Sequence, residues 1–164
     1  MNKTTQLKKL LLQRKALPCP GVYDALSARM VEYCGFQACQ ISGFGVSASS
    51  LGMTDASFTS LEEIVRITSN IVRAVDIPVM TDADTGYGNA VNVWWTTKRL
   101  EETGAAGMNL EDQCFPKRCG HMAGKQLISL GEMVGKIRAA VDAKRDPDFV
   151  INARTDAAYV CGIE

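Results

Sequence analysis

The sequence predicts an α/β fold in which parallel strands alternate with helices. Five short apolar segments suited to strands are separated by segments in which apolar residues recur with the spacing of a helix. Polar residues gather directly after four of the five strands. Strands joined by single helices pair in parallel through right-handed crossovers, so the pattern fits either an open doubly wound sheet or a (β/α)8 barrel.

We favour the barrel of the TIM type, because its strand ends converge on one mouth, whereas an open sheet gathers mainly the loops beside its switch point. Such a barrel needs roughly 250 residues. The 164 residues of this chain would supply about the first five βα units. We therefore expect residues 1–164 to form a single partial barrel domain, apparently truncated, with two unpaired strand edges.

The first two expected strands lie near the N-terminus. A basic helix is predicted at about residues 4–15, followed by a strand within 16–23. Asp24 is a good helix N-cap and Gly35 is a typical residue just after a helix, so a helix is expected between them. The second strand covers residues 36–41.

A small-residue loop at residues 42–45 follows the second strand and leads into a long excursion through Asp55. A long loop after a strand is usually functional. Ser60 to Glu63 form a capping box that opens a helix ending near Ala74, and the third strand is expected at residues 78–81.

The second half of the chain repeats the pattern. Asn89 begins a helix that ends near Gly104, and a second capping box, Ser129 to Glu132, opens another helix. The remaining expected elements are a strand at 107–111, the end of that helix near Lys144, and a strand at 148–153.

Composition narrows the classes of function. Basic and acidic residues balance at 18 each, so no net field favours nucleic acid, and no apolar run is long enough for a membrane span. The basic first 17 residues leave a mitochondrial presequence open, although a packed amphipathic helix is preferred. Six cysteines without CxxC pairs favour a reducing, cytoplasmic setting and argue against zinc.

Cys119 lies in the segment Lys117-Arg118-Cys119-Gly120-His121. Two cations and an imidazole beside a thiol favour the thiolate, which is the reactive form. The alternative is that Cys119 is one of several inert buried cysteines in a loop of solvated cations. Acidic residues upstream favour a site, because Asp82 and Asp84 end the third strand in the same way as Glu111 ends the fourth. Acids at strand ends also often serve only as caps.

Four motifs in this order resemble the isocitrate lyase and phosphoenolpyruvate mutase superfamily. They are Asp82-Ala-Asp84-Thr-Gly-Tyr-Gly, Leu110-Glu-Asp-Gln113, Lys117-Arg-Cys-Gly-His121 and Ala153-Arg-Thr-Asp156. The third motif is typical of the lyase branch, whose members act on 2-methylisocitrate or 2,3-dimethylmalate, with oxaloacetate hydrolases nearby. The resemblance implies a Mg²⁺-dependent barrel enzyme that forms a homotetramer and takes a small carboxylate substrate.

The resemblance also implies roles for single residues. Asp82 and Asp84 would hold Mg²⁺, or Mn²⁺, with Glu111 beside them and Asp55 as an outer acid. Cys119 would be the catalytic acid or base, and the residues around it would be Lys117, Arg118 and His121. The substrate would be bound by Ser42, Gly43, Phe44 and Arg154. Gln40 and Phe44 depart from the lyase pattern, which leaves the size and shape of the substrate open.

Three functions therefore remain. The first is a Mg²⁺-dependent lyase that cleaves a carbon–carbon bond in a small 2-hydroxy di- or tricarboxylate, giving an oxo acid and a carboxylic acid. The second is hydrolysis or decarboxylation of oxaloacetate in the same site. The third is a non-catalytic barrel fragment.

Overall fold

The structure is a computed structural model that describes residues 2–13 and 15–162. Five parallel strands form one sheet in the order β1-β2-β3-β4-β5. The strands are β1 (Gly21–Val22), β2 (Cys39–Ile41), β3 (Val79–Asp82), β4 (Gly107–Glu111) and β5 (Val150–Arg154). A doubly wound sheet reverses its strand order at a switch point, and this one does not. The sequential order is that of a (β/α) barrel, which confirms the predicted fold class.

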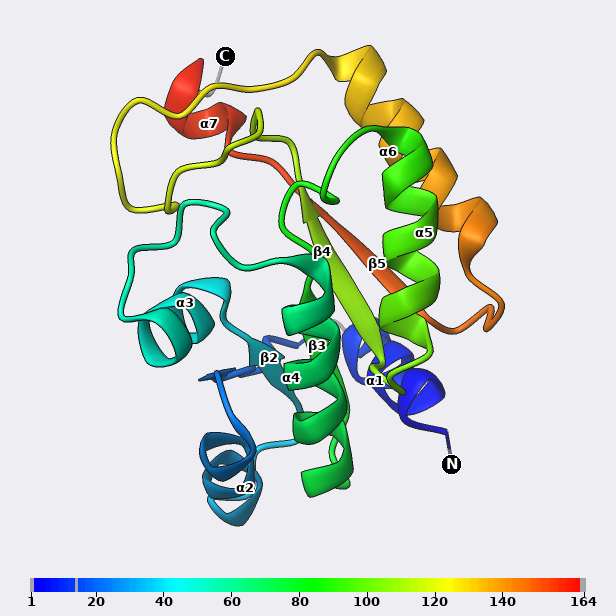
Figure 1. The fold of residues 1–164 in the computed structure, drawn as a ribbon. Coiled ribbons are helices and arrows are strands. Elements are labelled where there is room, and N and C mark those ends of the chain that lie inside the picture. The colour runs from blue at the N-terminus through cyan, green and yellow to red at the C-terminus, as the bar shows by residue number, and fades with distance from the viewer. Residues whose placement is uncertain (1, 14, 163–164) are drawn as a thin grey trace.

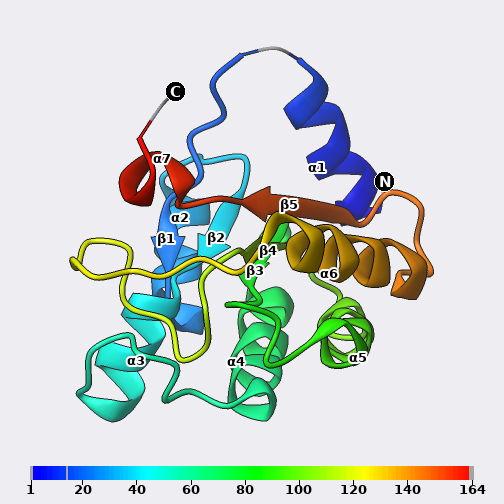
Figure 2. The ribbon, with the colours of Figure 1, turned by 90° about the horizontal axis from the view of Figure 1, so that it is seen from above.

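Seven helices connect or flank the described strands. They are α1 (Lys3–Leu12), α2 (Ala25–Tyr33), α3 (Gly43–Leu51), α4 (Leu61–Ala74), α5 (Ala90–Glu101), α6 (Leu130–Ala143) and α7 (Ala157–Val160). Figure 1 shows α4, α5 and α6 packed along the sheet, with α1 at the end of the strands opposite to α7. Seen from above in Figure 2, β5 runs between α1 and α6.

Strand alternation separates the packing of this fold from its polar site. Successive side chains of a strand point to opposite faces. Val79, Met108 and Leu110 lie in the core cluster with the apolar faces of α4, α5 and α6. The other face carries Asp82 and Glu111, one at the end of each of two neighbouring strands.

Strand register explains why the polar side chains of the second face meet. Asp82 is in register with Asn109, which is in register with Asn152, and the Asn152 amide donates to Asn109 at 2.7 Å. One pleat further on, Glu111 is in register with Arg154. The last residues of β4 and β5 are therefore side by side at the carboxyl end of the sheet.

Local capping fixes several helix starts as predicted. The reciprocal capping boxes of Asp24 with Ser27, Ser60 with Glu63, and Asn89 with Asn92 are all present. At Ser129 only half of the predicted capping box forms. The Ser129 hydroxyl accepts from the Glu132 amide, but the Glu132 side chain does not accept from the Ser129 amide.

The loop predicted at residues 42–45 is wrong, because α3 begins there. The Ser42 hydroxyl accepts from the Gly45 amide at 3.1 Å and caps the helix, and Gly52 ends it with a φ of 63°. Gly43 and Gly45 have low helix propensity and hid this short helix in the sequence. The short helix α7 after β5 was also not predicted.

Other boundaries shift by a few residues. The first two strands are shorter than predicted, and β3 and β5 extend through Asp82 and Arg154. The N-terminal helix predicted at about 4–15 is α1, which ends at Leu12, and Arg14 lies outside the described residues. Helix α1 closes the amino-terminal end of the sheet, where Leu7 packs with Ala38, Met80 and Ala106.

Candidate active site

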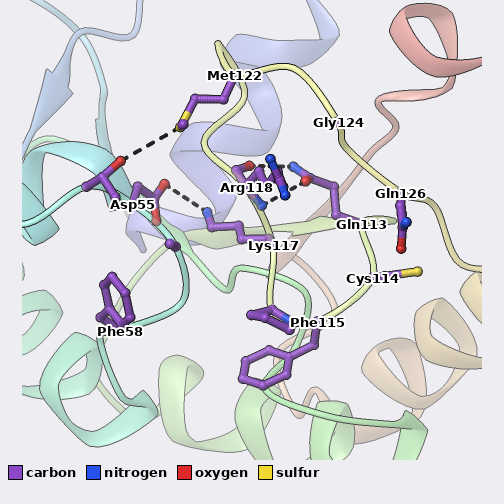
Figure 3. A pocket seen from close by; sticks show the side chains of 13 residues that line it. Asp55, Phe58, Gln113, Cys114, Phe115, Lys117, Arg118, Met122, Gly124 and Gln126 are labelled. Carbon is purple, nitrogen blue, oxygen red and sulfur yellow. Dashed lines mark hydrogen bonds and ion pairs between the residues drawn. The ribbon is translucent and has the colours of Figure 1, made fainter.

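Four carboxylates and one lysine form the centre of the site. The ammonium of Lys117 lies 2.7 Å from Oδ1 of Asp84, 3.0 Å from Oδ2 of Asp55 and 3.9 Å from Oε1 of Glu111. The Lys117 side chain is only 4% exposed. Figure 3 shows it directed at Asp55. The acids of β3, β4 and the loop after α3 therefore meet around one buried cation.

Asp82 holds the first turn of α3 against the end of β3. Its Oδ2 accepts from the Gly43 amide at 3.0 Å, and its Oδ1 accepts from the Asp84 amide at 2.9 Å. A Cβ on Gly43 would collide with the Asp82 carboxylate. Glycine is therefore needed at this position for the backbone to reach the acid.

Burial changes the proton affinity of the acids. The pKa of Asp84 is raised to about 6, mainly by burial and also by neighbouring Asp82 and Asp55, while Lys117 opposes the shift. Burial likewise raises the pKa of Glu111 to about 7 against the lowering effect of Lys117 and Arg154. One ammonium does not compensate four nearby carboxylates, so two of them retain protons more readily than acids in water.

The pKa of Lys117 is raised, which favours its charged form. Burial alone would lower its pKa, but Asp82, Asp84, Glu111 and Asp55 together raise it. The charged form of Lys117 is thus favoured, whereas the charged form of Asp84 is disfavoured, first by burial and then by Asp82 and Asp55. Among the described residues, the Lys117 ammonium is the polar partner of Oδ1 of Asp84, at 2.7 Å.

Arg154 and Glu111 form a second ion pair at the strand ends. Their NH1 and Oε2 atoms are 3.2 Å apart, as their shared register requires. Burial would lower the pKa of Arg154, but Glu111 and Asp156 raise it. The guanidinium also lies against Gly120, where a Cβ would be 2.6 Å from its NH2. Arg154 therefore connects the end of β5 to the turn that carries Cys119.

Cys119 is 7% exposed, and its sulfur is 3.8 Å from Nδ1 of His121. The other two cations expected around the thiol point elsewhere. Lys117 turns to the carboxylates, and the Arg118 guanidinium donates to the Ala123 carbonyl at 3.4 Å. Of the three residues expected beside the thiol, His121 is therefore the one that contacts the sulfur.

One cavity of about 290 Å³ joins most of the predicted site residues. It is lined by Ser42, Gly43, Phe44, Asp55, Asp82, Lys117, Cys119, His121 and Arg154, together with Cys19, Gly21, Gln40 and Gly120. Arg118 instead lines a neighbouring cavity of about 510 Å³ (Figure 3). The thiol thus faces the same space as Asp55 and Asp82, whereas Asp84, Glu111 and Arg118 do not line it.

Three site residues were missed from the sequence. The Gln113 side chain donates to Glu111, to the Arg118 carbonyl and to Asp156 at 3.0–3.1 Å, and accepts from the Arg118 amide. Ser57 donates to Asp84 and accepts from the Lys117 amide. Lys125 donates to the Gly120 carbonyl. Gln113 is the last residue of the motif Leu110-Glu-Asp-Gln113, whereas no motif in the sequence includes Ser57 or Lys125.

The donor chemistry suits a hard divalent cation, since carboxylate oxygens are the ligands that Mg²⁺ prefers. Within the described residues, however, no three or more acidic, cysteine or histidine side chains converge as a formed metal site. The acids fit Mg²⁺ in type and charge, and the Lys117 ammonium lies among them. Across the same part of the chain, no helix is both long and apolar enough to cross a bilayer.

The fold and the site together are a parallel α/β sheet with acids and a buried thiol at its carboxyl end. The chain belongs to the phosphoenolpyruvate phosphomutase family, whose model matches residues 7–161.

Two curated relatives illustrate the match. The chain is 46% identical to 2,3-dimethylmalate lyase of Eubacterium barkeri over 100% of its own length and 57% of that protein. It is 47% identical to 2-methylisocitrate lyase of Aeropyrum pernix over 96% of its own length and 50% of that protein. The chain thus spans about half the length of the curated relatives it matches.

Solved structures agree with the fold. Oxaloacetate acetylhydrolase in complex with the inhibitor 3,3-difluorooxalacetate matches with a TM-score of 0.93 at 39% identity, over 99% of this chain and 56% of the other. Phosphonopyruvate hydrolase in complex with oxalate and Mg²⁺ matches with a TM-score of 0.91 at 34% identity, over the same shares.

Proposed function

We propose that the full-length protein is a Mg²⁺-dependent carbon–carbon lyase. Its substrate is a small 2-hydroxy di- or tricarboxylate of the 2-methylisocitrate or 2,3-dimethylmalate type, and its products are an oxo acid and a carboxylic acid. The observation that carries the proposal is the shared cavity, which Cys119 and His121 line together with Asp82, Asp55 and Arg154. Relatives with both lyase names support it.

The reaction needs one proton at the end of bond cleavage. When the carbon–carbon bond breaks, the hydroxyl-bearing carbon becomes a carbonyl as its hydroxyl gives its proton to solvent, and the bond's electron pair moves to the carbon beside a carboxylate. The Cys119 thiol gives its proton to that carbon, and the resulting thiolate, hydrogen-bonded by His121, regains a proton from solvent before the next turnover. Positioned proton transfer of this kind contributes about 10²–10⁴-fold to a rate.

The cations of the site bind the substrate's carboxylates. Arg154 presents a planar guanidinium beside the cavity, suited to a carboxylate. Ser42, Gly43 and Phe44 at the start of α3 line the same cavity and would contact the oxo-acid portion. Arg118 acts from outside this cavity by fixing the loop that carries Cys119.

Asp82, Asp84, Glu111 and Asp55 are the residues that would hold Mg²⁺, or Mn²⁺ in its place. A bound divalent ion supplies charge neutralisation for oxygen atoms of the oxo acid. Burial raises the pKa of both Asp84 and Glu111, and this supports the proposal, because a divalent charge beside them would favour their ionised forms.

The test is an activity assay of the full-length protein on 2-methylisocitrate, 2,3-dimethylmalate and oxaloacetate, with Mg²⁺ and with EDTA. We expect metal-dependent release of an oxo acid from one of the first two substrates. Cys119→Ser should lower kcat by about 10²–10⁴-fold and leave KM within about 3-fold. Cys34→Ser is the matched control, because Cys34 is an exposed cysteine beyond α2. A Cys119→Ser protein with undiminished kcat contradicts the mechanism.

Oxaloacetate hydrolysis or decarboxylation is the second candidate, favoured by the likeness to oxaloacetate acetylhydrolase. The two reactions separate by product, because hydrolysis gives oxalate and acetate whereas decarboxylation gives pyruvate and CO₂. Failure to turn over any of the three substrates with Mg²⁺ would favour the non-catalytic alternative.

Magnesium binding needs a readout other than turnover. Calorimetric titration of MgCl₂ into the protein should show binding that Asp82→Asn weakens at least tenfold. Asp76→Asn, in the exposed connection after α4, is the control. The homotetramer and the cytoplasmic location remain predictions, which light scattering and fractionation can test.

A further inference from the structure

The segment that carries Cys119 is held at several points other than the catalytic groups. Residues 112–129 connect β4 to α6 over the carboxyl end of the sheet (Figure 1). Within this connection, the Met122 amide donates to the Cys119 carbonyl at 2.8 Å and closes a tight turn. We call residues Cys119 to Met122 the thiol turn. Its position relative to β4 and β5 determines where the sulfur lies in the cavity.

Lys125 is the lysine that holds this turn. Its ammonium donates to the Gly120 carbonyl at 2.8 Å, lies 3.4 Å from Oδ1 of Asp156 and sits 4.2 Å from the centre of the Tyr159 ring. The side chain is 2% exposed. A lysine is rarely buried without a specific partner. The partners of the Lys125 ammonium are one carbonyl, one carboxylate and one aromatic face.

Gly124 directly precedes Lys125. It adopts a φ of 79°, in the left-handed region that glycine enters without steric cost. The three partners of Lys125 come from two places: Gly120 belongs to the turn, whereas Asp156 and Tyr159 belong to the segment after β5. The lysine thus joins the thiol turn to the segment after β5.

Asp156 is itself fixed on the sheet side. Its Oδ2 accepts from Gln113 at 3.0 Å and from Arg154 at 3.2 Å, and its amide donates to Asp112 at 3.0 Å. Displacement of Asp156 would therefore disturb β4 and β5 together. A lysine bonded to such a residue transmits the position of the strand ends to the thiol turn.

We propose that Lys125 is a positioning residue for Cys119, holding the thiol turn against the end of β5 through Gly120, Asp156 and Tyr159. It touches neither the sulfur nor the cavity that the substrate would occupy, since it is absent from the residues that line that cavity. Its effect on the reaction passes through the backbone of Gly120. The proposal rests on the proposed function only where it concerns turnover, because the position of Cys119 can be measured without a substrate.

The test compares Lys125→Met with Lys125→Arg in the full-length protein. Met keeps the apolar stem and removes the charge and the donors, whereas Arg keeps both. Lys144→Met is the matched control, because Lys144 also donates to two backbone carbonyls, those of Pro147 and Phe149, at the other end of β5. It should change neither readout below.

The first readout is the alkylation rate of Cys119 by iodoacetamide, followed peptide by peptide by mass spectrometry. We expect Lys125→Met to raise it at least tenfold while Cys39, which is 0% exposed, stays protected. Lys125→Arg should remain within about 3-fold of wild type.

If Cys39 becomes reactive as well, the Lys125→Met variant has unfolded. Tyr159→Leu then replaces it, since Tyr159 is 61% exposed and its removal spares the core. That variant should raise Cys119 alkylation about 2- to 5-fold, in line with the loss of a cation–π contact.

The second readout is the split between kcat and KM. A displacement of about 1 Å at a reacting group can lower a rate about 10²-fold, so Lys125→Met should lower kcat to that extent with KM within about 3-fold, and Lys125→Arg should restore most of it. Wild-type alkylation of Cys119 in both Lys125→Met and Tyr159→Leu overturns the proposal, whatever the enzyme's activity. An inactive wild-type enzyme whose Cys119 still becomes accessible in Lys125→Met refutes the proposed function and retains the positioning role.

Discussion

Replacing Lys117 with methionine should make the stability of the protein depend strongly on pH. The substitution removes an ammonium that lies within 3.0 Å of both Asp55 and Asp84 and leaves the carboxylates buried. A carboxyl whose pKa rises from 4.5 to about 7, as for Glu111, costs about 3 kcal/mol of folding free energy when it ionises. Asp84, raised from 3.8 to about 6, costs a similar amount. Lys117 already opposes both shifts, so its loss enlarges them.

The raised pKa values of Asp84 and Glu111 determine whether stability rises or falls with pH. A raised carboxyl pKa means that the folded protein binds the proton more tightly, so stability is greatest below the unfolded pKa and falls as pH rises through the folded one. For Asp84 and Glu111 that window runs from about 4 to 7 in the wild type and extends upward in Lys117→Met. Removing one partner of a buried ion pair costs about 3–5 kcal/mol. We expect that loss at pH 8 and no more than about half of it at pH 5.

The measurement is thermal unfolding of both proteins in EDTA at pH 5, 6, 7 and 8, at one protein concentration. A loss of 3–5 kcal/mol lowers the midpoint by roughly 6–20 °C for a chain of this size. Lys3→Met is the control, because Lys3 donates to the Val72 and Val75 carbonyls away from the acids, and its loss should not vary between pH 5 and pH 8. An equal loss for Lys117→Met at pH 5 and pH 8 would refute the idea that carboxylate repulsion is the cause.

Other substitutions test single contacts of the fold and site. Glu111→Gln keeps the shape of the side chain without its charge, so the thermal midpoint at pH 8 should rise by several degrees while any turnover falls; an unchanged midpoint contradicts the raised pKa of this residue. Gly43→Ala would place a methyl group against the Asp82 carboxylate, so calorimetry should show weaker Mg²⁺ binding, whereas Gly131→Ala, where a Cβ meets nothing, should not change it. Ser60→Ala removes the α4 cap and should cost about 1 kcal/mol in chemical denaturation, with no change in Mg²⁺ binding; a loss below about 0.3 kcal/mol would mean that the capping box adds little.

Much of the sheet could be predicted because its signals are local and periodic. The fourth strand was placed with both ends correct, at 107–111, because an apolar run there is bounded by Gly104 and by acids. The capping box at Ser60 located α4 in the same way. The start of α3 was missed since its helix forms from Ser42 capping and from contact with Asp82, neither of which leaves a periodic pattern.

The site was predicted in composition better than in arrangement. Strand-end position placed Asp82, Glu111 and Arg154 near each other, because parallel strands end on one edge. The sequence does not predict in which direction a long side chain such as that of Lys117 or Arg118 points. Lys117 points to Asp55 and Asp84, which are far away in the sequence, whereas Arg118 turns to the carbonyl of Ala123 in its own loop. Lys125 shows the same limit, since its partner Asp156 follows a different strand.

The two faces of the sheet have separate consequences for how such a protein can change. Residues that fill the helix-facing core alternate, one by one, with residues that face the site, so a substitution on one face leaves the other face's neighbours in place. A lineage could exchange inward-facing side chains and acquire a new reaction without rebuilding its core. That independence is one physical reason why lyases, hydrolases and mutases can share one scaffold.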